Sequence, residues 1–63
     1  MRVVATGALD RQTREYHLML SHLVYWHEMD AATLVLVFVT GDAFLVKGEE
    51  RARVLVRLLA MEG

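Results

Sequence analysis

The chain has 63 residues and a net charge of −1 with its histidines neutral, which indicates neither a basic nucleic-acid surface nor an acidic disordered tail. It contains no cysteine, so disulfides and thiolate metal sites are excluded. A chain of this length forms a single small domain that buries only about 60% of its unfolded surface. Its hydrophobic fraction of 56% exceeds the usual ~45–50%, and this excess indicates a buried subunit interface.

The first segment is a short β-branched run. Arg2–Thr6 predicts a strand, and Gly7 interrupts it. Arg2 and Gly7 are typical of an edge strand, where charge and glycine discourage further pairing.

Residues 10–28 admit two interpretations. In the helical one, Asp10 is an N-cap, and apolar residues recur at helical spacing as far as Asp30. In the extended one, Glu15–Leu20 is a strand, residues 21–22 form a bend and Leu23–Glu28 is a second strand. The extended interpretation is preferred, because tyrosine, valine and tryptophan at residues 24–26 favour strands.

The clearest signal is a β-hairpin within Thr33–Gly48. Two β-rich runs, Leu34–Val39 and Ala43–Val46, flank Gly41-Asp42, which suits a two-residue type II′ turn. That turn would pair Val39 with Phe44 and Val37 with Val46. One face would then carry Val35, Val37, Val39, Phe44 and Val46, and the other Leu34, Leu36, Phe38, Leu45 and Lys47. Both faces are apolar, so the hairpin needs cover on both sides.

Glu49–Glu62 predicts a helix that follows Gly48. Glu49 and Glu50 lie in the first turn, where the helix dipole favours negative charge. The predicted apolar stripe is centred on Ala52, Leu55, Val56 and Leu59 and widened by Val54, Leu58 and Met61. One helix can cover one face of the hairpin, so the remaining apolar surface should meet a second chain.

These elements predict an α+β fold with an antiparallel sheet of four to five strands and one C-terminal helix. The alternative is β-α-β-β-α, with residues 10–28 helical. The expected function is a non-catalytic, homo-oligomerising protein-interaction module, most simply a two-fold dimer, that also has a protein partner. The expected interface residues are Trp26, Phe38, Phe44, Leu55 and Leu59, with Trp26 and Tyr25 as aromatic anchors.

No catalytic, cofactor or metal site is predicted. His17, His22 and His27 are five residues apart, so neighbours in this set would not share one face of a strand or helix. Glu15, Glu28 and Asp30 lack an identifiable pocket in so short a chain. Ser21 and His22 are adjacent and would point apart on a strand. No glycine-rich phosphate loop is present.

The alternative function is a small nucleic-acid-binding regulator. Two arginine groups would carry it: Arg2, Arg11 and Arg14 in the N-terminal half, and Arg51, Arg53 and Arg57 on the helix. Exposed aromatic side chains would then stack on bases, although no basic groove is evident.

The element order over residues 23–59 resembles the C-terminal half of many small bacterial and phage β-rich domains, which close an antiparallel sheet with one helix. That likeness implies a fold and no functional residue. The longest apolar run, Leu34–Val39, is far below the ~18–20 residues of a membrane span, and the first ten residues lack a signal-like apolar core. We therefore expect a cytoplasmic protein without a membrane partner.

Overall fold

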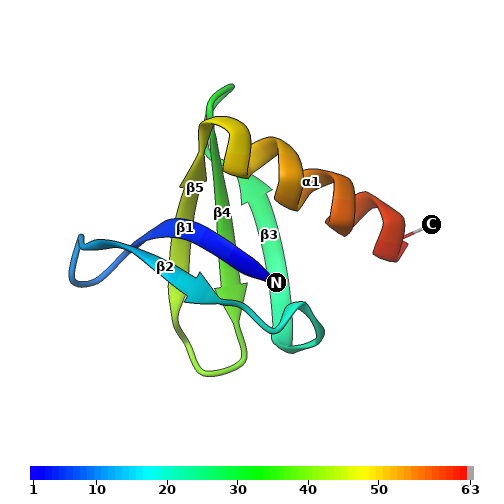
Figure 1. Ribbon diagram of the computed structural model, residues 1–63. Coiled ribbons are helices and arrows are strands. Elements are labelled where there is room, and N and C mark those ends of the chain that lie inside the picture. Colours follow the sequence, from blue (N-terminus) through cyan, green and yellow to red (C-terminus); the bar gives the residue numbers. More distant parts are fainter. Residues whose placement is uncertain (63) are drawn as a thin grey trace.

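The computed structural model describes residues 1–62, which form an antiparallel sheet with one C-terminal α-helix (Figure 1). The elements are β1 (Arg2–Gly7), β2 (Thr13–His17), the 3-10 helix η1 (Leu20–His22), β3 (Leu23–Glu28), β4 (Thr33–Phe38), β5 (Ala43–Lys47) and α1 (Gly48–Glu62). The predicted α+β fold is thereby confirmed, with five strands. The alternative with a helix over residues 10–28 is wrong, because both β-favouring runs there pair as strands around the short η1.

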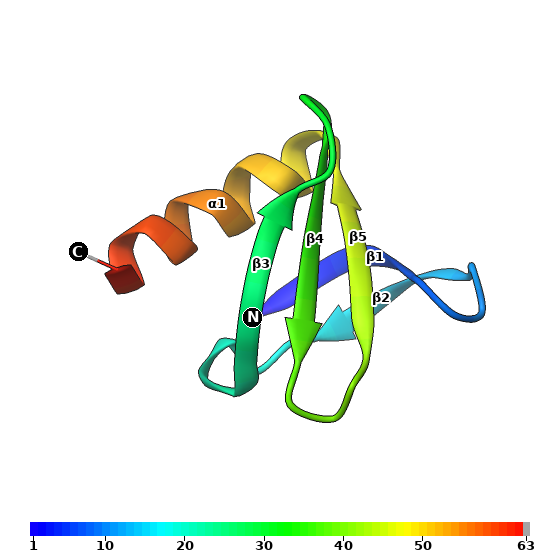
Figure 2. The ribbon, with the colours of Figure 1, turned by 180° about the vertical axis from the view of Figure 1, so that it is seen from behind.

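The sheet has the order β2-β1-β5-β4-β3, and all neighbouring strands are antiparallel. The β1–β2 hairpin crosses the other three strands at a steep angle (Figures 1 and 2). Only two pairs join the two parts, Thr6 with Leu45 and Gly7 with Phe44. Because β1 lies between β2 and β5, the interpretation of Arg2–Thr6 as an edge strand is wrong.

The hydrophobic core lies between the β1–β2 hairpin and the three-stranded part of the sheet, and α1 closes it from one side. Its fully buried large side chains come from β1, β4, β5 and α1: Val3, Leu34, Leu36, Val46, Val54 and Leu58. Burial alternates along β1 and along most of β4, as expected where one strand face meets the core. Each such valine or leucine contributes about 1.5–3 kcal/mol relative to an exposed side chain.

The β4–β5 hairpin forms where predicted, but its loop has three residues instead of two. The Gly41 N–H donates to the Phe38 carbonyl, and the Phe38 N–H donates to the Asp42 carbonyl, each at 2.9 Å. Gly41 has a φ of 91°, the left-handed conformation that ends a three-residue hairpin loop. Glycine at this position is therefore explained by the longer loop.

The longer loop changes which residues share a face of the hairpin. Phe44 pairs with Leu36, not with Val39, and Val46 pairs with Leu34. Since directly paired residues lie on one face, Phe44 and Val46 join the leucines and Phe38 on the core side. The outer face carries Val35, Val37, Ala43, Leu45 and Lys47. The predicted grouping of Phe44 and Val46 with the valines of β4 is wrong.

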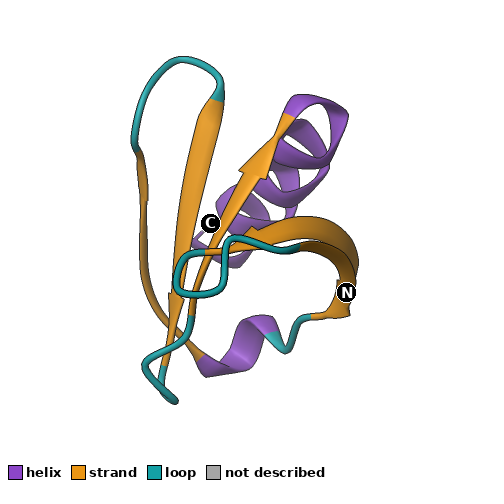
Figure 3. Ribbon diagram, turned by 90° about the vertical axis from the view of Figure 1, so that its left-hand side faces the viewer, coloured by secondary structure: helices purple, strands orange, loops and turns teal. Residues whose placement is uncertain are grey.

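Helix α1 begins directly after β5, without an intervening loop (Figure 3). Gly48 makes the joint with a φ of 61°. The predicted helix is confirmed, but its buried face is centred on Val54 and Leu58, whereas Ala52, Val56 and Leu59 are exposed. The predicted centre of the stripe is therefore wrong by roughly half a turn of the helix.

Two side chains of α1 explain why its buried face is centred on Val54 and Leu58, because they bind the part of β1 that lies beyond its pairing with β5. The Val4 N–H donates to Glu50 Oε1 at 3.1 Å. The Arg53 guanidinium donates to the Arg2 carbonyl at 3.2 Å and also pairs with the Glu50 carboxylate. The helix thus supplies a donor and an acceptor to an otherwise open strand edge.

Candidate interaction surfaces

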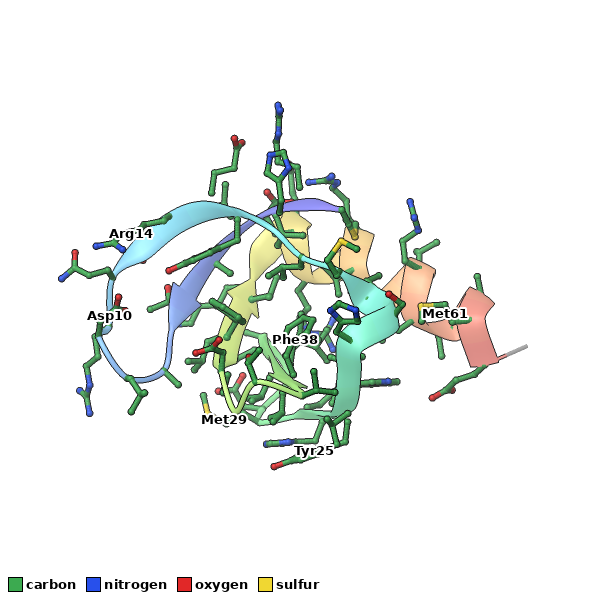
Figure 4. The ribbon with its side chains drawn as sticks, turned by 90° about the horizontal axis from the view of Figure 1, so that it is seen from below. Asp10, Arg14, Tyr25, Met29, Phe38 and Met61 are labelled. Carbon is green, nitrogen blue, oxygen red and sulfur yellow. The ribbon has the colours of Figure 1, made fainter. Side chains whose placement is uncertain are left out.

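The outer face of β3, β4 and β5 is uncovered by any other described element. Figure 2 shows these strands in front, with α1 and the β1–β2 hairpin behind them. Alternation along the paired strands places Tyr25 opposite Val37 and His27 opposite Val35 on this face. The Tyr25 side chain is 55% exposed and Met29 is 53% exposed. In Figure 4 both lie on the side of the strands away from α1.

We name the outer sheet face by its residues: Tyr25, His27 and Met29 from the β3 side, Val35 and Val37 of β4, and Ala43, Leu45 and Lys47 of β5. The valines and Leu45 are half-buried by their neighbours and form the centre. Tyr25 and His27 stack with ring centroids 6.3 Å apart and form part of the margin. The surface is therefore apolar at its centre and mixed at its margin.

The second apolar surface is the flank of α1 that faces away from the sheet. Val56 is 67% exposed and Leu59 is 54% exposed. Met61 is also exposed, because the C-terminal part of α1 extends beyond the sheet (Figure 1). This flank is narrower than the outer sheet face and is formed by α1 alone.

The structure does not bring the five expected interface residues together on one surface. Phe38 is buried in the core and Phe44 is half-buried against it, with ring centroids 5.7 Å apart. Trp26 is opposite Leu36 and packs against the same core from β3. Leu55 is half-buried and Leu59 is exposed on α1. Of the five, Leu59 is the most accessible.

A groove that the sequence did not predict lies between β2 and the β4–β5 turn. It consists of two recesses of about 470 and 230 Å³, and both are lined by Tyr16, Asp42 and Phe44. The Tyr16 and Phe44 rings form its floor, with centroids 4.6 Å apart. Because these residues are distant in the chain, only the curling of the sheet brings them together.

The three histidines do not converge. His17 is on the exposed side of β2 and accepts a hydrogen bond of 3.4 Å from Arg2 Nε, His22 ends η1, and His27 stacks on Tyr25. Within residues 1–62, no group of three histidine or carboxylate side chains is placed to hold a metal ion.

The candidate acids hold turns and pair with arginines. Glu15 lies 3.5 Å from Arg2, and Glu28 lies 2.5 Å from Arg51. The Asp30 carboxylate accepts the Ala32 N–H at 2.8 Å, which lowers the pKa of that carboxyl below its usual value. An exposed Asx turn of this type stabilises a loop and does not prepare an acid for proton transfer.

Most of the arginines are paired with carboxylates of the same chain. Besides the pairs of Arg2 and Arg51, Arg14 lies 3.8 Å from Asp10, and Arg53 pairs with Glu50. Each pair cancels a positive charge that phosphate would need to meet. The nucleic-acid alternative stays a prediction, and no contact among the described residues favours it.

No helix within residues 1–62 has the length and apolar character needed to cross a membrane. Comparison with protein-family models gives no match, and neither the curated proteins nor the solved structures contain one similar enough to match.

Proposed function

We propose that this chain is a non-catalytic interaction module that self-associates through the outer sheet face, most simply as a two-fold dimer. The observation that supports the proposal is an apolar surface spread over three strands with no described element covering it. An uncovered apolar sheet face favours association, because burying apolar surface away from water is favourable. The proposal retains the expected cytoplasmic location, which cell fractionation tests.

A two-fold axis suits this surface because it would pack the central valines and Leu45 of one chain against the same residues of the other. Two sheets packed in this way would form a sandwich about 10 Å thick. Tyr25 and Met29 would lie at the margin, where half-exposed side chains can be covered without rearranging the strands. The exposed Lys47 would remain at the edge in contact with water.

The size of the face determines how tight such a dimer can be. Three strands spaced ~4.8 Å apart, with five or six residues rising ~3.3 Å each, present a face of roughly 14 by 18 Å. A standard interface buries about 800 Å² on each partner, which is nearly a fifth of the total surface of 4262 Å². The outer sheet face is smaller than that, so we expect a dissociation constant in the micromolar range or weaker.

Sedimentation equilibrium from about 1 µM to 1 mM tests the proposal over that range. The wild-type chain should pass from monomer to dimer, and Tyr25→Glu should remain monomeric, because it places a charge at the margin of the interface. Leu9→Glu is the matched control. Leu9 is 92% exposed in the β1–β2 turn, away from the outer sheet face, and its substitution should leave the dimer intact.

Val56→Glu separates this interface from the flank of α1. If Val56→Glu dissociates the dimer and Tyr25→Glu does not, the interface is on the helix and the outer sheet face is misassigned. A wild-type chain that stays monomeric up to 1 mM (roughly the weakest affinity considered) would refute self-association as a whole.

A further inference from the structure

The groove between β2 and the β4–β5 turn combines three features that a binding site for an extended chain requires. The first is an apolar floor. Phe44 lies between Tyr16 and Phe38, with centroid distances of 4.6 and 5.7 Å and interplanar angles of 57° and 75°. These tilted and edge-to-face contacts hold the rings in place, because aromatic pairs favour such geometry. The floor is therefore formed before any ligand binds.

The second feature is an open strand edge beside the groove. Met1 and Leu18 exchange both of their backbone hydrogen bonds, at 2.8 Å and 2.7 Å. In an antiparallel ladder such pairs alternate, so Thr13, Glu15 and His17 direct their N–H and C=O groups away from β1. No strand within residues 1–62 pairs with that side of β2. An unpaired edge of this type is a template for an added strand.

The third feature is an acidic group shared by both recesses. The Asp42 carboxylate accepts a hydrogen bond of 2.7 Å from the Thr40 hydroxyl, and within residues 1–62 no arginine, lysine or histidine nitrogen lies within 4.0 Å of it. By contrast, Asp10 at the far side of the larger recess is paired with Arg14. A carboxylate beside two aromatic rings suits a cationic side chain, which gains from both the charge and the ring faces.

We propose that this groove binds an extended segment of a partner protein, which adds as a strand to the free edge of β2 and places a lysine or arginine side chain against Asp42. Apolar side chains of the segment lie on the rings of Tyr16 and Phe44. The groove lies on a different surface from the outer sheet face. The inference therefore goes beyond self-association and does not depend on it.

The test uses the full chain and an eight-residue peptide with both ends blocked, in which three valines and one arginine occupy alternate positions with threonines between them, so that the apolar and cationic side chains share one face of the added strand. A matched peptide with glutamate in place of that arginine carries the opposite charge at the same position. We expect the arginine peptide to bind with a dissociation constant of about 1 mM or tighter. Amide NMR signals of Glu15, His17 and Asp42 should shift, and the glutamate peptide should leave them unchanged.

Two changes separate the strand edge from the charge. Methylation of alternate peptide amides removes the donors that an added strand needs, so it should abolish binding. Asp42→Asn should weaken binding about two- to fivefold, the range for one exposed ion pair. Asp30→Asn is the matched control, because it removes the same charge from the loop at the opposite end of β4, and it should leave the affinity unchanged.

Equal binding of the two peptides, binding that survives amide methylation, or shifts confined to Tyr25 and Leu45 would each overturn the proposal. So would the absence of binding at 1 mM peptide (roughly the weakest affinity expected). Repeating the titration on Tyr25→Glu keeps the two proposals apart. A monomeric variant that still binds the arginine peptide supports the groove whatever the outcome for the dimer.

Discussion

Removal of the Glu50 carboxylate should open the edge of β1. In Glu50→Ala, the Val4 N–H loses its acceptor, and Arg53 loses the partner that directs it toward the Arg2 carbonyl. A hydrogen bond to a charged group is worth about 1.5–3 kcal/mol when buried. The Glu50 side chain is 23% exposed and Val4 is 42% exposed, so water recovers much of that loss, and losing the contact with β1 should cost about 0.5–1.5 kcal/mol.

Glu49→Ala is the control for the helix dipole. Both glutamates lie in the first turn of α1, and each contributes about 0.3–1 kcal/mol through the dipole. Glu49 is exposed and makes no hydrogen bond or ion pair to β1 among the described contacts. The difference between the two variants therefore isolates the contact with β1 and should be about 1 kcal/mol. Glu50→Gln retains an acceptor and should fall between them.

Chemical denaturation of the three variants and the wild-type chain measures the free energies of unfolding. A domain of this size has roughly 3–9 kcal/mol in total, so a 1 kcal/mol loss should lower the melting temperature by about 4–8 °C. Hydrogen exchange at the Val4 amide reports the same contact directly and should accelerate in Glu50→Ala alone. Equal destabilisation by Glu49→Ala and Glu50→Ala, with unchanged exchange at Val4, would refute the assigned role of Glu50.

Three further outcomes are expected. Gly41→Ala should lower the free energy of unfolding by about 1–2 kcal/mol, because the φ of 91° disfavours an L side chain. A Cβ at this position would meet no atom within 4 Å, so D-alanine introduced by chemical synthesis should remove that cost. Equal denaturation midpoints for the two alanine variants would contradict this explanation. Leu36→Ala should lower the free energy of unfolding by about 2–5 kcal/mol, because Leu36 is fully buried in the core. Chemical denaturation followed by circular dichroism measures the loss, and a value below 1 kcal/mol (well under that range) would show that the core is assigned wrongly. The pKa of the Asp30 carboxyl, measured by NMR, should lie below its usual value of about 3.9. Because this pKa is lowered in the folded chain, the ionised carboxylate should stabilise the fold above the usual value, and that contribution should disappear as the pH falls through the lowered pKa. In Asp30→Asn this part of the acid dependence of stability should be absent.

The strands and the helix could be predicted from the sequence because each rests on local chemistry. Val24–Trp26 favours an extended chain, and the glutamates after Gly48 favour a helix start. These local preferences agree with the pairings that the strands make. The fold class therefore followed without knowledge of any distant contact.

The register of the hairpin could not be predicted, because Gly41-Asp42 suits a two-residue turn and Gly41 equally suits the end of a three-residue loop. The choice moves Phe44 from the outer side to the core, since an odd shift in pairing exchanges the faces of a strand. Phe44 was therefore predicted on the face of the β4 valines, whereas Phe38 shares the face of the leucines in either register. The centre of the outer sheet face consists of the smaller valines and Leu45.

The buried face of α1 and the groove could not be predicted from the sequence either, since both depend on where the β1–β2 hairpin crosses the sheet. Apolar residues cover a wide arc of the helix, so their spacing alone is compatible with more than one buried face. The contacts of Glu50 and Arg53 with β1 select one of them. Tyr16 and Phe44 meet only after that crossing has formed.

The narrow junction between β1 and β5 also has a consequence for the order of folding. The hairpins β1–β2, β3–β4 and β4–β5 each join neighbouring segments, and such hairpins form in about 1–10 µs. The junction instead unites the two ends of the chain, and the nearby bond from Val4 to Glu50 spans 46 residues. Closing so long a segment is entropically the most expensive step. We therefore expect the junction to form last and to set the folding rate, with the three hairpins already present as the chain closes into its native topology.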